Sequence, residues 1–328
     1  MQEVLDKIQE AEKQCPWDEI SRGHFVYHWA KELKKRNYFK VCLPIVCGGQ
    51  DLDLFSFMEI TRRLSFIDGN LGWRFQIANG ATYFFKNFPK EIAVNLFRIN
   101  ELLISGSGSN SGTGSKVADG YIVSGCWEYC SGSDLATHVS FVFSDNQTGK
   151  SFAAIVPRSK TISFCAHNFT GMQHTATSQL NLEQIFVSHE NCFHVEEIIN
   201  NIPVPAFDYE FNVFARAFFI PVVIGLYERY LQELNSHLSF KGLSCNQTII
   251  EESSELIKVY ETILLLLKNK KYIEFNALVI EFNERIKQNI ISSFHFSGMH
   301  GLKKDSGINY QFQNLIAATQ HSLLNFQP

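Results

Sequence analysis

The sequence predicts an α+β protein in which a small β region lies between two helical blocks. Residues 1–100 carry apolar side chains at the spacing of amphipathic helices. Residues 101–200 change to short runs rich in β-branched and aromatic residues, separated by Gly, Asn, Asp and Ser. Residues 201–328 return to long helical segments. We therefore expect an N-terminal α domain, a middle antiparallel β domain and a C-terminal helical bundle with these bounds.

Length and composition are typical of a globular protein. The chain has 328 residues, 45% apolar and 19% charged, and its 29 Phe predict an aromatic-rich core or an apolar cavity. A net charge of -4 offers no basic surface for nucleic acid. The Cys and His residues show no disulfide or metal-ligand spacing. From this spacing we expect free thiols and no metal site. No apolar signal region or bilayer-length apolar run is seen, so we also expect no membrane association and a cytoplasmic location.

The N-terminal block is predicted to be helical throughout. Helical spacing places the expected helices at Met1–Gln14, Gly23–Arg36, Asp53–Ser65, Leu71–Phe85 and Pro89–Phe97. The turn at Cys47-Gly48-Gly49 separates the second of these helices from the third.

The middle region opens on a Gly/Ser run, Ser105–Ser115, which we interpret as a loop before the strands Tyr121–Ser124 and Cys126–Tyr129. No helix follows Gly106-Ser107-Gly108, which excludes a dinucleotide-binding fingerprint. Strand periodicity places Trp127 and Tyr129 on one face. The region as a whole predicts a small barrel or sandwich.

The C-terminal block begins after a linker at Pro203-Val204-Pro205. The helix predicted at Tyr209–Gln232 is apolar on nearly all sides, which is typical of the central helix of a bundle. Two amphipathic helices follow at Glu251–Lys268 and Lys271–Ser293, and the last helix is expected at Leu315–Asn325.

Several short motifs, each weak alone, follow one another along the chain: Leu43-Pro44 with Gly48-Gly49-Gln50, Glu59 to Trp73, Gly120 to Gly132, Gly171-Met172 with Thr175 to Ser178, and Phe186-Val187. Their order and spacing resemble those of the acyl-CoA dehydrogenase superfamily. Within that superfamily, Ser124–Gly132, Phe207–Gly225 and His321 are similar to the two-component flavin-dependent monooxygenases.

This resemblance implies a flavin-dependent oxidoreductase that uses FAD or FMN. Reduced flavin would come from a separate reductase, react with O2 and hydroxylate a small apolar or aromatic substrate. Ser131 would contact flavin N5, and His321 would face the substrate. The implied flavin-binding residues are Tyr129, Ser131, Trp127, Ser107, Ser109, Thr175, Ser178 and Gly298. Phe211, Phe214 and Phe218 of the Phe-rich helix would line the substrate pocket. A homotetramer, built as a dimer of dimers, is also implied.

Two alternatives remain open. Acyl-CoA dehydrogenation needs a carboxylate base, but Ser322 and a position near Ala215 occupy the two places where the family has one, which leaves only Glu210 nearby. The family's Arg-Asp pair is replaced by Gln313-Asn314. A non-catalytic relative that acts as a binding module is therefore the second alternative.

The sharpest expectation concerns Ser131 and His321. If the superfamily architecture holds, both face one cavity, with the flavin ring between them. Ser131 would donate a hydrogen bond to the ring, and His321, with a pKa near its reference value of about 6.5, would approach from the substrate side. The simpler interpretation of His321 is a histidine packed in the core of the last helix, and that of the Gly/Ser run is a surface loop.

Overall fold

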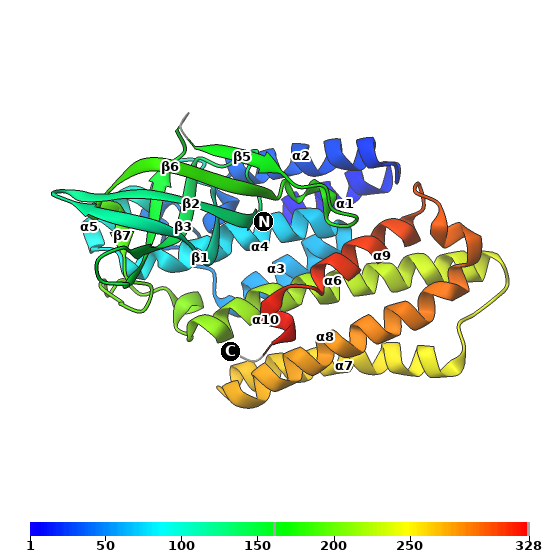
Figure 1. Ribbon diagram of the computed structural model, residues 1–328. Helices are drawn as coiled ribbons and strands as arrows, with labels where there is room; N and C mark the ends of the chain where they lie inside the picture. Colours follow the sequence, from blue (N-terminus) through cyan, green and yellow to red (C-terminus); the bar gives the residue numbers. More distant parts are fainter. Residues whose placement is uncertain (160–161, 327–328) are drawn as a thin grey trace.

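The computed structural model of the protein describes residues 1–159 and 162–326 (Figure 1). Helices come first, at α1 Gln2–Lys13, α2 Glu19–Lys35, α3 Leu54–Ile67, α4 Gly69–Gly80 and α5 Lys90–Phe97. The strands follow, at β1 Ile104–Val117, β2 Gly120–Cys130, β3 His138–Asp145, β4 Ser151–Pro157, β5 Ser163–Ala166, β6 Ser178–Ser188 and β7 Cys192–Phe193. The last helices are α6 Phe211–Phe240, α7 Gln247–Lys268, α8 Tyr272–Phe294, α9 Gly307–Ala318 and α10 Ser322–Asn325. The predicted order of helices, sheet and helices is confirmed.

Aspartate caps fix the start of the two helices that lead to the site. Asp53 accepts hydrogen bonds from the backbone N–H groups of Phe55 and Ser56 at the start of α3. Asp68, which ends α3, accepts from Asn70 N and Leu71 N and so begins α4 at once. Side-chain acceptors at these positions satisfy N–H groups that a helix leaves without partners. The short turn sets the direction in which α4 runs toward the sheet.

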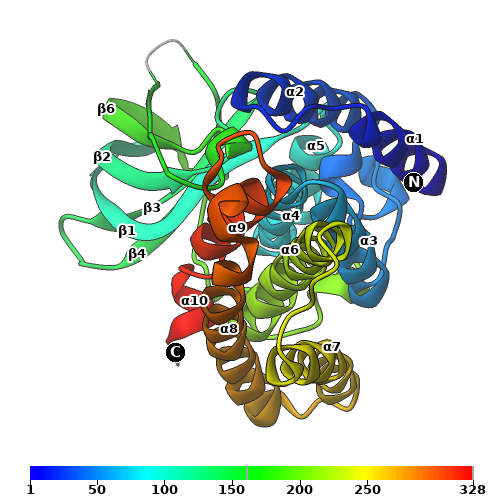
Figure 2. The same ribbon diagram turned by 90° about the vertical axis from the view of Figure 1, so that its right-hand side faces the viewer.

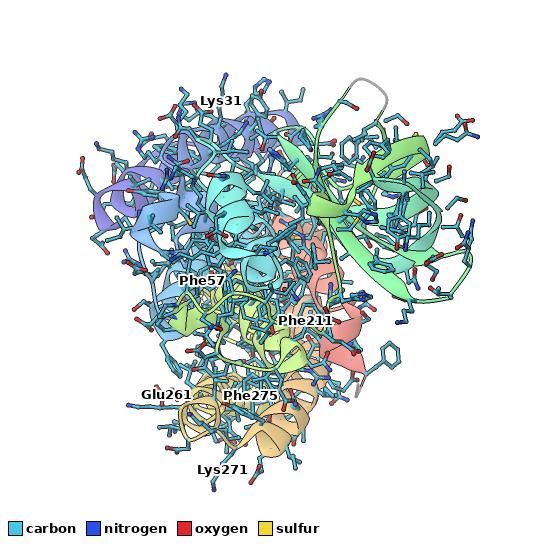
Figure 3. All side chains as sticks on the ribbon, turned by 90° about the vertical axis from the view of Figure 1, so that its left-hand side faces the viewer. Lys31, Phe57, Phe211, Glu261, Lys271 and Phe275 are labelled. Carbon is cyan, nitrogen blue, oxygen red and sulfur yellow. The ribbon has the colours of Figure 1, made fainter. Side chains whose placement is uncertain are left out.

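Helix α6 is the central element of the helical part, as its all-round apolar pattern predicts (Figure 2). By length and composition alone α6 could cross a membrane, but 83% of its most apolar stretch of 18 residues is buried inside the protein. A Cβ atom added to Gly225 would lie 2.3 Å from the carbonyl oxygen of Arg62, so glycine is what allows α6 to pack directly on α3. Figure 3 shows Phe57 inside these layers, with Lys31 and Lys271 at opposite ends of the molecule.

The described residues of the middle region form one seven-stranded sheet with the order β5-β6-β2-β1-β3-β4-β7. Two expectations were wrong here. The sheet is mixed, since β1 pairs with β3 in parallel, and the Gly/Ser run is strand β1 rather than a loop. A Cβ atom at Gly112 would lie 2.2 Å from Trp127 Cζ2, and one at Gly114 would lie 2.5 Å from the Phe143 ring. The glycines of this strand therefore make room for aromatic rings of the neighbouring strands.

The predicted last helix is interrupted. α9 ends at Ala318, and α10 begins at Ser322 after the short turn that contains His321. His321 has non-helical backbone angles, with φ -59° and ψ 131°, at the N-cap of α10. The expectation that His321 lies inside a continuous helix was therefore wrong, and the break places its ring beside α4 and α6.

Candidate functional site

Ser131 lies where β2 has just ended, and it contacts the helical part through Trp73 of α4. The indole Nε1–H of Trp73 donates a hydrogen bond to Ser131 Oγ at 3.1 Å. Ser131 is only 3% exposed. Its backbone oxygen accepts a hydrogen bond from Ser105 Oγ at 2.8 Å, which ties the end of β2 to the start of β1. The serine is thus held in place from both sides.

The ring of His321 also lies beside the Trp73 indole. Its ring stacks on Phe219 of α6, with 3.7 Å between ring centroids, and lies 6.0 Å from the Trp73 ring. The centroids of Trp73 and Phe219 are 5.3 Å apart. Trp73, Phe219 and His321, which we call the aromatic triad, therefore form one compact group at the junction of α4, α6 and α10.

The protonation state of His321 follows from its contacts. Its Nδ1 accepts the backbone N–H of Leu323 at 3.3 Å, so Nδ1 carries no proton and the neutral ring has its proton on Nε2. Burial lowers the pKa of His321 to about 4. The expectation of a pKa near the reference value was wrong, because the ring is packed among aromatic side chains. At neutral pH His321 is a neutral hydrogen-bond donor through Nε2.

Ser131 and His321 both contact Trp73, Ser131 through a hydrogen bond to the indole N–H and His321 through its ring. Two surface hollows of about 310 and 400 Å³ lie away from these residues, one between α6 and α7 and one beside α1 and α3.

Strand β1 offers an open backbone segment close to Ser131. Its parallel pairing with β3 is interrupted between Gly106 and Asn110, and its pairing with β2 begins only at Gly112. Ser107 and Ser109 lie in this interruption, where Ser109 N donates to Ser107 Oγ at 3.3 Å. A Cβ atom at Gly108 would meet nothing within 4 Å. An irregular strand segment beside open space at Gly108 could accommodate the polar edge of a flavin or its phosphate.

Trp127 and Tyr129 do not share a face. A register shift between Trp127 and Cys130 turns the strand, and Tyr129 has a left-handed φ of 63°. Trp127 is fully buried, with its ring beside Phe141 and its Nε1 donating to Val142 O at 2.8 Å, so it belongs to the core of the sheet. Tyr129 is 68% exposed. Trp127 is therefore excluded as a wall for a flavin, whereas Tyr129 remains accessible.

Thr175 and Ser178 lie on the segment that packs against the end of β2. The backbone N–H of Gly132 donates to Thr175 O at 2.9 Å, and Ser178 Oγ lies 2.8 Å from Ser133 Oγ. Both side chains are buried. Thr175 and Ser178 therefore have structural contacts within this segment. Thr177 lies between them and was not among the predicted site residues, but its Oγ1 lies 2.7 Å from Ser131 Oγ.

The remaining predicted residues lie apart from the triad. Phe214 and Phe218 are 2% and 1% exposed and stack within the helical core, so they do not line an open pocket; Phe211 is 42% exposed at the start of α6. Gly298 lies before α9 and His321 after it, so the 12 residues of that helix, about 18 Å, separate them.

No carboxylate contacts the aromatic triad in the described part of the chain. Asp134, close to Ser131 in sequence, is paired with Arg74 of α4. Glu210 is exposed at the N-cap of α6. The pKa of Tyr83 is raised first by burial and then by the negative charge of Glu210. Ser322 and Ala215 hold the other two places considered for a base.

Sequence reasoning did not assign a role to Trp73 or Arg216. Trp73 lies in the Asp68–Trp73 motif, so the motif alone could have indicated it. Arg216 of α6 is fully buried, and its Nε and Nη2 donate to the carbonyl oxygens of Leu323 and Phe326 at 2.8 and 2.7 Å. It anchors the segment that carries His321, and only the fold reveals this contact.

No protein-family model matches the chain. It is 24% identical over 161 residues to the flavin-dependent monooxygenase oxygenase subunit HsaA of Rhodococcus jostii. It is 22% identical over 250 residues to the indole-3-acetate monooxygenase of Acinetobacter baumannii. The two alignments cover 48% and 75% of this chain, but only 42% and 62% of those relatives.

Solved structures show the fold. The HsaA monooxygenase of Mycobacterium tuberculosis superimposes with a TM-score of 0.77 at 17% identity, over 99% of this chain and 91% of the other. XiaF of Streptomyces, in complex with FADH2 and glycerol, gives 0.80 at 13% identity over 98% and 91%. The glutaryl-coenzyme A dehydrogenase complex with glutaryl-CoA gives 0.75 at 13% identity over 97% and 90%. The predicted acyl-CoA dehydrogenase-like fold is confirmed.

Proposed function

We propose that the protein is a flavin-dependent monooxygenase that oxygenates a small aromatic substrate. The observation that carries the proposal is the arrangement of Ser131 and the neutral, Nε2-protonated His321 beside Trp73, with no carboxylate of residues 1–159 or 162–326 hydrogen-bonded to them. Hydroxyl, imidazole and indole groups bind and orient neutral molecules but do not supply a strong base. Sequence similarity to named flavin-dependent monooxygenases supports the same class.

The cofactor would be FAD or FMN. The residues that fit it are the open segment of β1 at Ser107–Ser109, the exposed Tyr129 and the Ser131 hydroxyl. The reduced flavin would supply the chemistry, activating O2 so that one oxygen atom enters the substrate and the other leaves as water. Among solved relatives of this fold, XiaF contains FADH2 and KijD3 contains FMN.

The side chains of this protein would bind and orient the substrate. Phe219 and Trp73 offer flat apolar surfaces, which favours a planar aromatic ring. His321 Nε2–H would donate a hydrogen bond to an oxygen atom of the substrate or of the reacting oxygen, because Nδ1 is already an acceptor. Phe57, Phe214 and Phe218 stack on one another within the helical core and have no direct part in this proposal.

Acyl-CoA dehydrogenation is the less favoured candidate. It requires a base next to the flavin, and Glu210, the carboxylate considered for it, is exposed and contacts none of the triad. The proposal further includes a separate flavin reductase, a homotetramer and a cytoplasmic location. The preference between FMN and FAD is tested by comparing the binding of the two reduced flavins.

The experiment is to mix the protein with FMN or FAD that has been reduced anaerobically, and then to add ¹⁸O2 and a panel of phenols and indoles. The expected result is saturable binding of reduced flavin and a product that carries one ¹⁸O atom. Reduction of bound flavin by an anaerobic acyl-CoA panel would instead indicate a dehydrogenase. A protein that binds neither FMN nor FAD in either redox state would be a binding module.

A further inference from the structure

Three hydroxyl groups form a row that starts at Ser131. Ser131 Oγ lies 2.7 Å from Thr177 Oγ1, and Thr177 Oγ1 lies 2.8 Å from Thr175 Oγ1. Thr175 Oγ1 lies 2.7 Å from the backbone oxygen of Met172. All of these separations are normal for O–H···O hydrogen bonds. The row therefore runs from the candidate site to a carbonyl group at its far end.

The carbonyl fixes the direction of every bond in the row. Met172 O can only accept, so the single proton of Thr175 must lie between these two atoms. Thr177 must then donate to Thr175, and its own proton is used. Ser131 must in turn donate to Thr177. The Ser131 proton therefore points away from Trp73, and Ser131 Oγ has only lone pairs left for other partners.

The contact with Trp73 agrees with this direction. The indole Nε1–H can only donate, and it is hydrogen-bonded to Ser131 Oγ. Trp73 is therefore a donor to Ser131 Oγ. A hydroxyl whose own proton is already used in a hydrogen bond can still accept such a bond.

The segment that ends the row is held firmly. The backbone N–H of Met172 donates to Asn314 Oδ1 at 2.7 Å, and that of His174 donates to Asn70 Oδ1 at 3.0 Å. Met172 and Ala176, on either side of Thr175, have left-handed φ angles of 54° and 51°. Such angles are costly for residues with a side chain and persist only where the surroundings impose them. A Cβ atom at Gly171 would lie 2.0 Å from Gln313 O, so the segment packs directly on α9.

We propose that Thr177 is a positioning residue which, held by Thr175, makes Ser131 a hydrogen-bond acceptor toward the flavin. This inference rests on the proposed function and reverses the expectation that Ser131 donates to the ring. Reduced flavin carries a hydrogen on N5 and can donate to Ser131, whereas N5 of oxidised flavin has only a lone pair. The hydroxyl row thus favours the reduced cofactor over the oxidised one.

The test compares the Kd of oxidised and of dithionite-reduced FMN and FAD, measured anaerobically by titration. In Thr177→Val the Ser131 proton loses its acceptor and becomes free to point toward N5. We expect the ratio of oxidised to reduced Kd to fall by about tenfold, the effect of one neutral hydrogen bond. The midpoint potential of bound flavin should fall by about 30 mV, the same change for a two-electron couple.

Matched variants separate orientation from a general structural effect. Thr177→Ser keeps the acceptor and should keep the wild-type ratio. Thr175→Val removes the acceptor of Thr177 and should lower the ratio in the same direction, which preserves the test if Thr177→Val does not fold. If both valine variants bind flavin with an unchanged ratio, the inference is wrong while the proposed function stands. If the wild-type protein binds neither redox form, the proposed function itself is wrong.

Discussion

Trp73 donates its indole N–H to Ser131 Oγ at 3.1 Å, and this bond joins helix α4 to the end of strand β2. The helix that carries Trp73 begins at Asp68, whose carboxylate also accepts the hydroxyl of Tyr310 on α9 at 2.9 Å. One helix therefore connects the sheet with α9, the helix that leads to His321. A substitution of Trp73 should therefore affect both the end of β2 at Ser131 and the helix that leads to His321.

Replacement of Trp73 by Phe keeps an aromatic ring beside Phe219 and His321 but removes the donor to Ser131. The loss of one hydrogen bond should lower the free energy of unfolding by about 1 kcal/mol. Trp73→Ala should cost about 3 kcal/mol or more, because it also leaves a cavity. Urea denaturation measures both. Equal effects of the two variants would show that the indole N–H contributes nothing.

The fold was predictable from the sequence because its elements have strong local signals. The all-round apolar pattern of α6 and the amphipathic patterns of α7 and α8 depend on neighbouring residues alone. Strand β1 was missed for the opposite reason. Its Ser and Gly residues have weak strand propensity, and it is a strand because Trp127 and Phe143 of neighbouring strands need the space above Gly112 and Gly114.

His321 has a structural role that can be separated from its proposed role in the site. Its Nδ1 caps α10, so His321→Ala should lower the free energy of unfolding by about 1 kcal/mol. His321→Asn supplies a good capping oxygen and should retain most of that stability, but it lacks the Nε2 donor. We therefore expect both variants to lose oxygenation activity, and only His321→Ala to lose stability. Thermal unfolding and product formation are the two measurements, and an active His321→Asn variant would contradict the donor role.

The lowered pKa of His321 predicts a specific pH dependence. The unfolded chain takes up a proton on this residue near pH 6.5, whereas the folded protein does so only near its pKa of about 4. Between these values the unfolded state binds more protons, so the contribution of the neutral ring to stability is complete above pH 6.5 and declines toward pH 4. Urea denaturation at pH 7 and pH 5 should show a larger decrease for the wild type than for His321→Asn. A ¹⁵N spectrum in which His321 titrates near pH 6.5 would refute this assignment.

Arg216 should hold the C-terminal segment in place. It donates to Leu323 O and Phe326 O without a carboxylate partner among its described contacts, and burial lowers its pKa. Arg216→Met removes both bonds while keeping an apolar stem, so we expect faster hydrogen exchange at 322–326 with little change in the helices α3 and α6. Arg216→Lys should have an intermediate effect, since it can donate to one of the two carbonyls. Unchanged exchange in the methionine variant would contradict an anchoring role.

The site was only partly predictable because its geometry depends on distant contacts. Motif position indicated Ser131 and His321, and both lie within contact of the same indole. The register shift that buries Trp127 and exposes Tyr129 has no local sequence signal. The direction of the Ser131 hydroxyl is set by Met172 O, 41 residues along the chain, and could be read only from the folded arrangement.

Exposed apolar residues on α7 indicate an interface between protomers. Ile250 and Ile257, 42% and 36% exposed, lie one heptad apart on the same side of α7. They border the hollow of about 310 Å³ that Leu231 and Ile249 also line. An exposed apolar groove of this kind is typical of an interface. We predict a homotetramer in which this surface is covered, and the double variant Ile250→Glu with Ile257→Glu should dissociate it.

Light scattering at micromolar concentration should return about four times the chain mass of 37.5 kDa for the wild type and a smaller species for the double variant. Lys258→Glu, a charge change at a neighbouring exposed position on α7, is the matched control and should leave the tetramer intact. Gly298 lies before α9 and His321 after it, so we predict that Gly298 contacts the flavin of a second protomer. Loss of the tetramer should therefore weaken flavin binding as well, and a monomeric wild type that binds flavin tightly would exclude both the assembly and this role of Gly298.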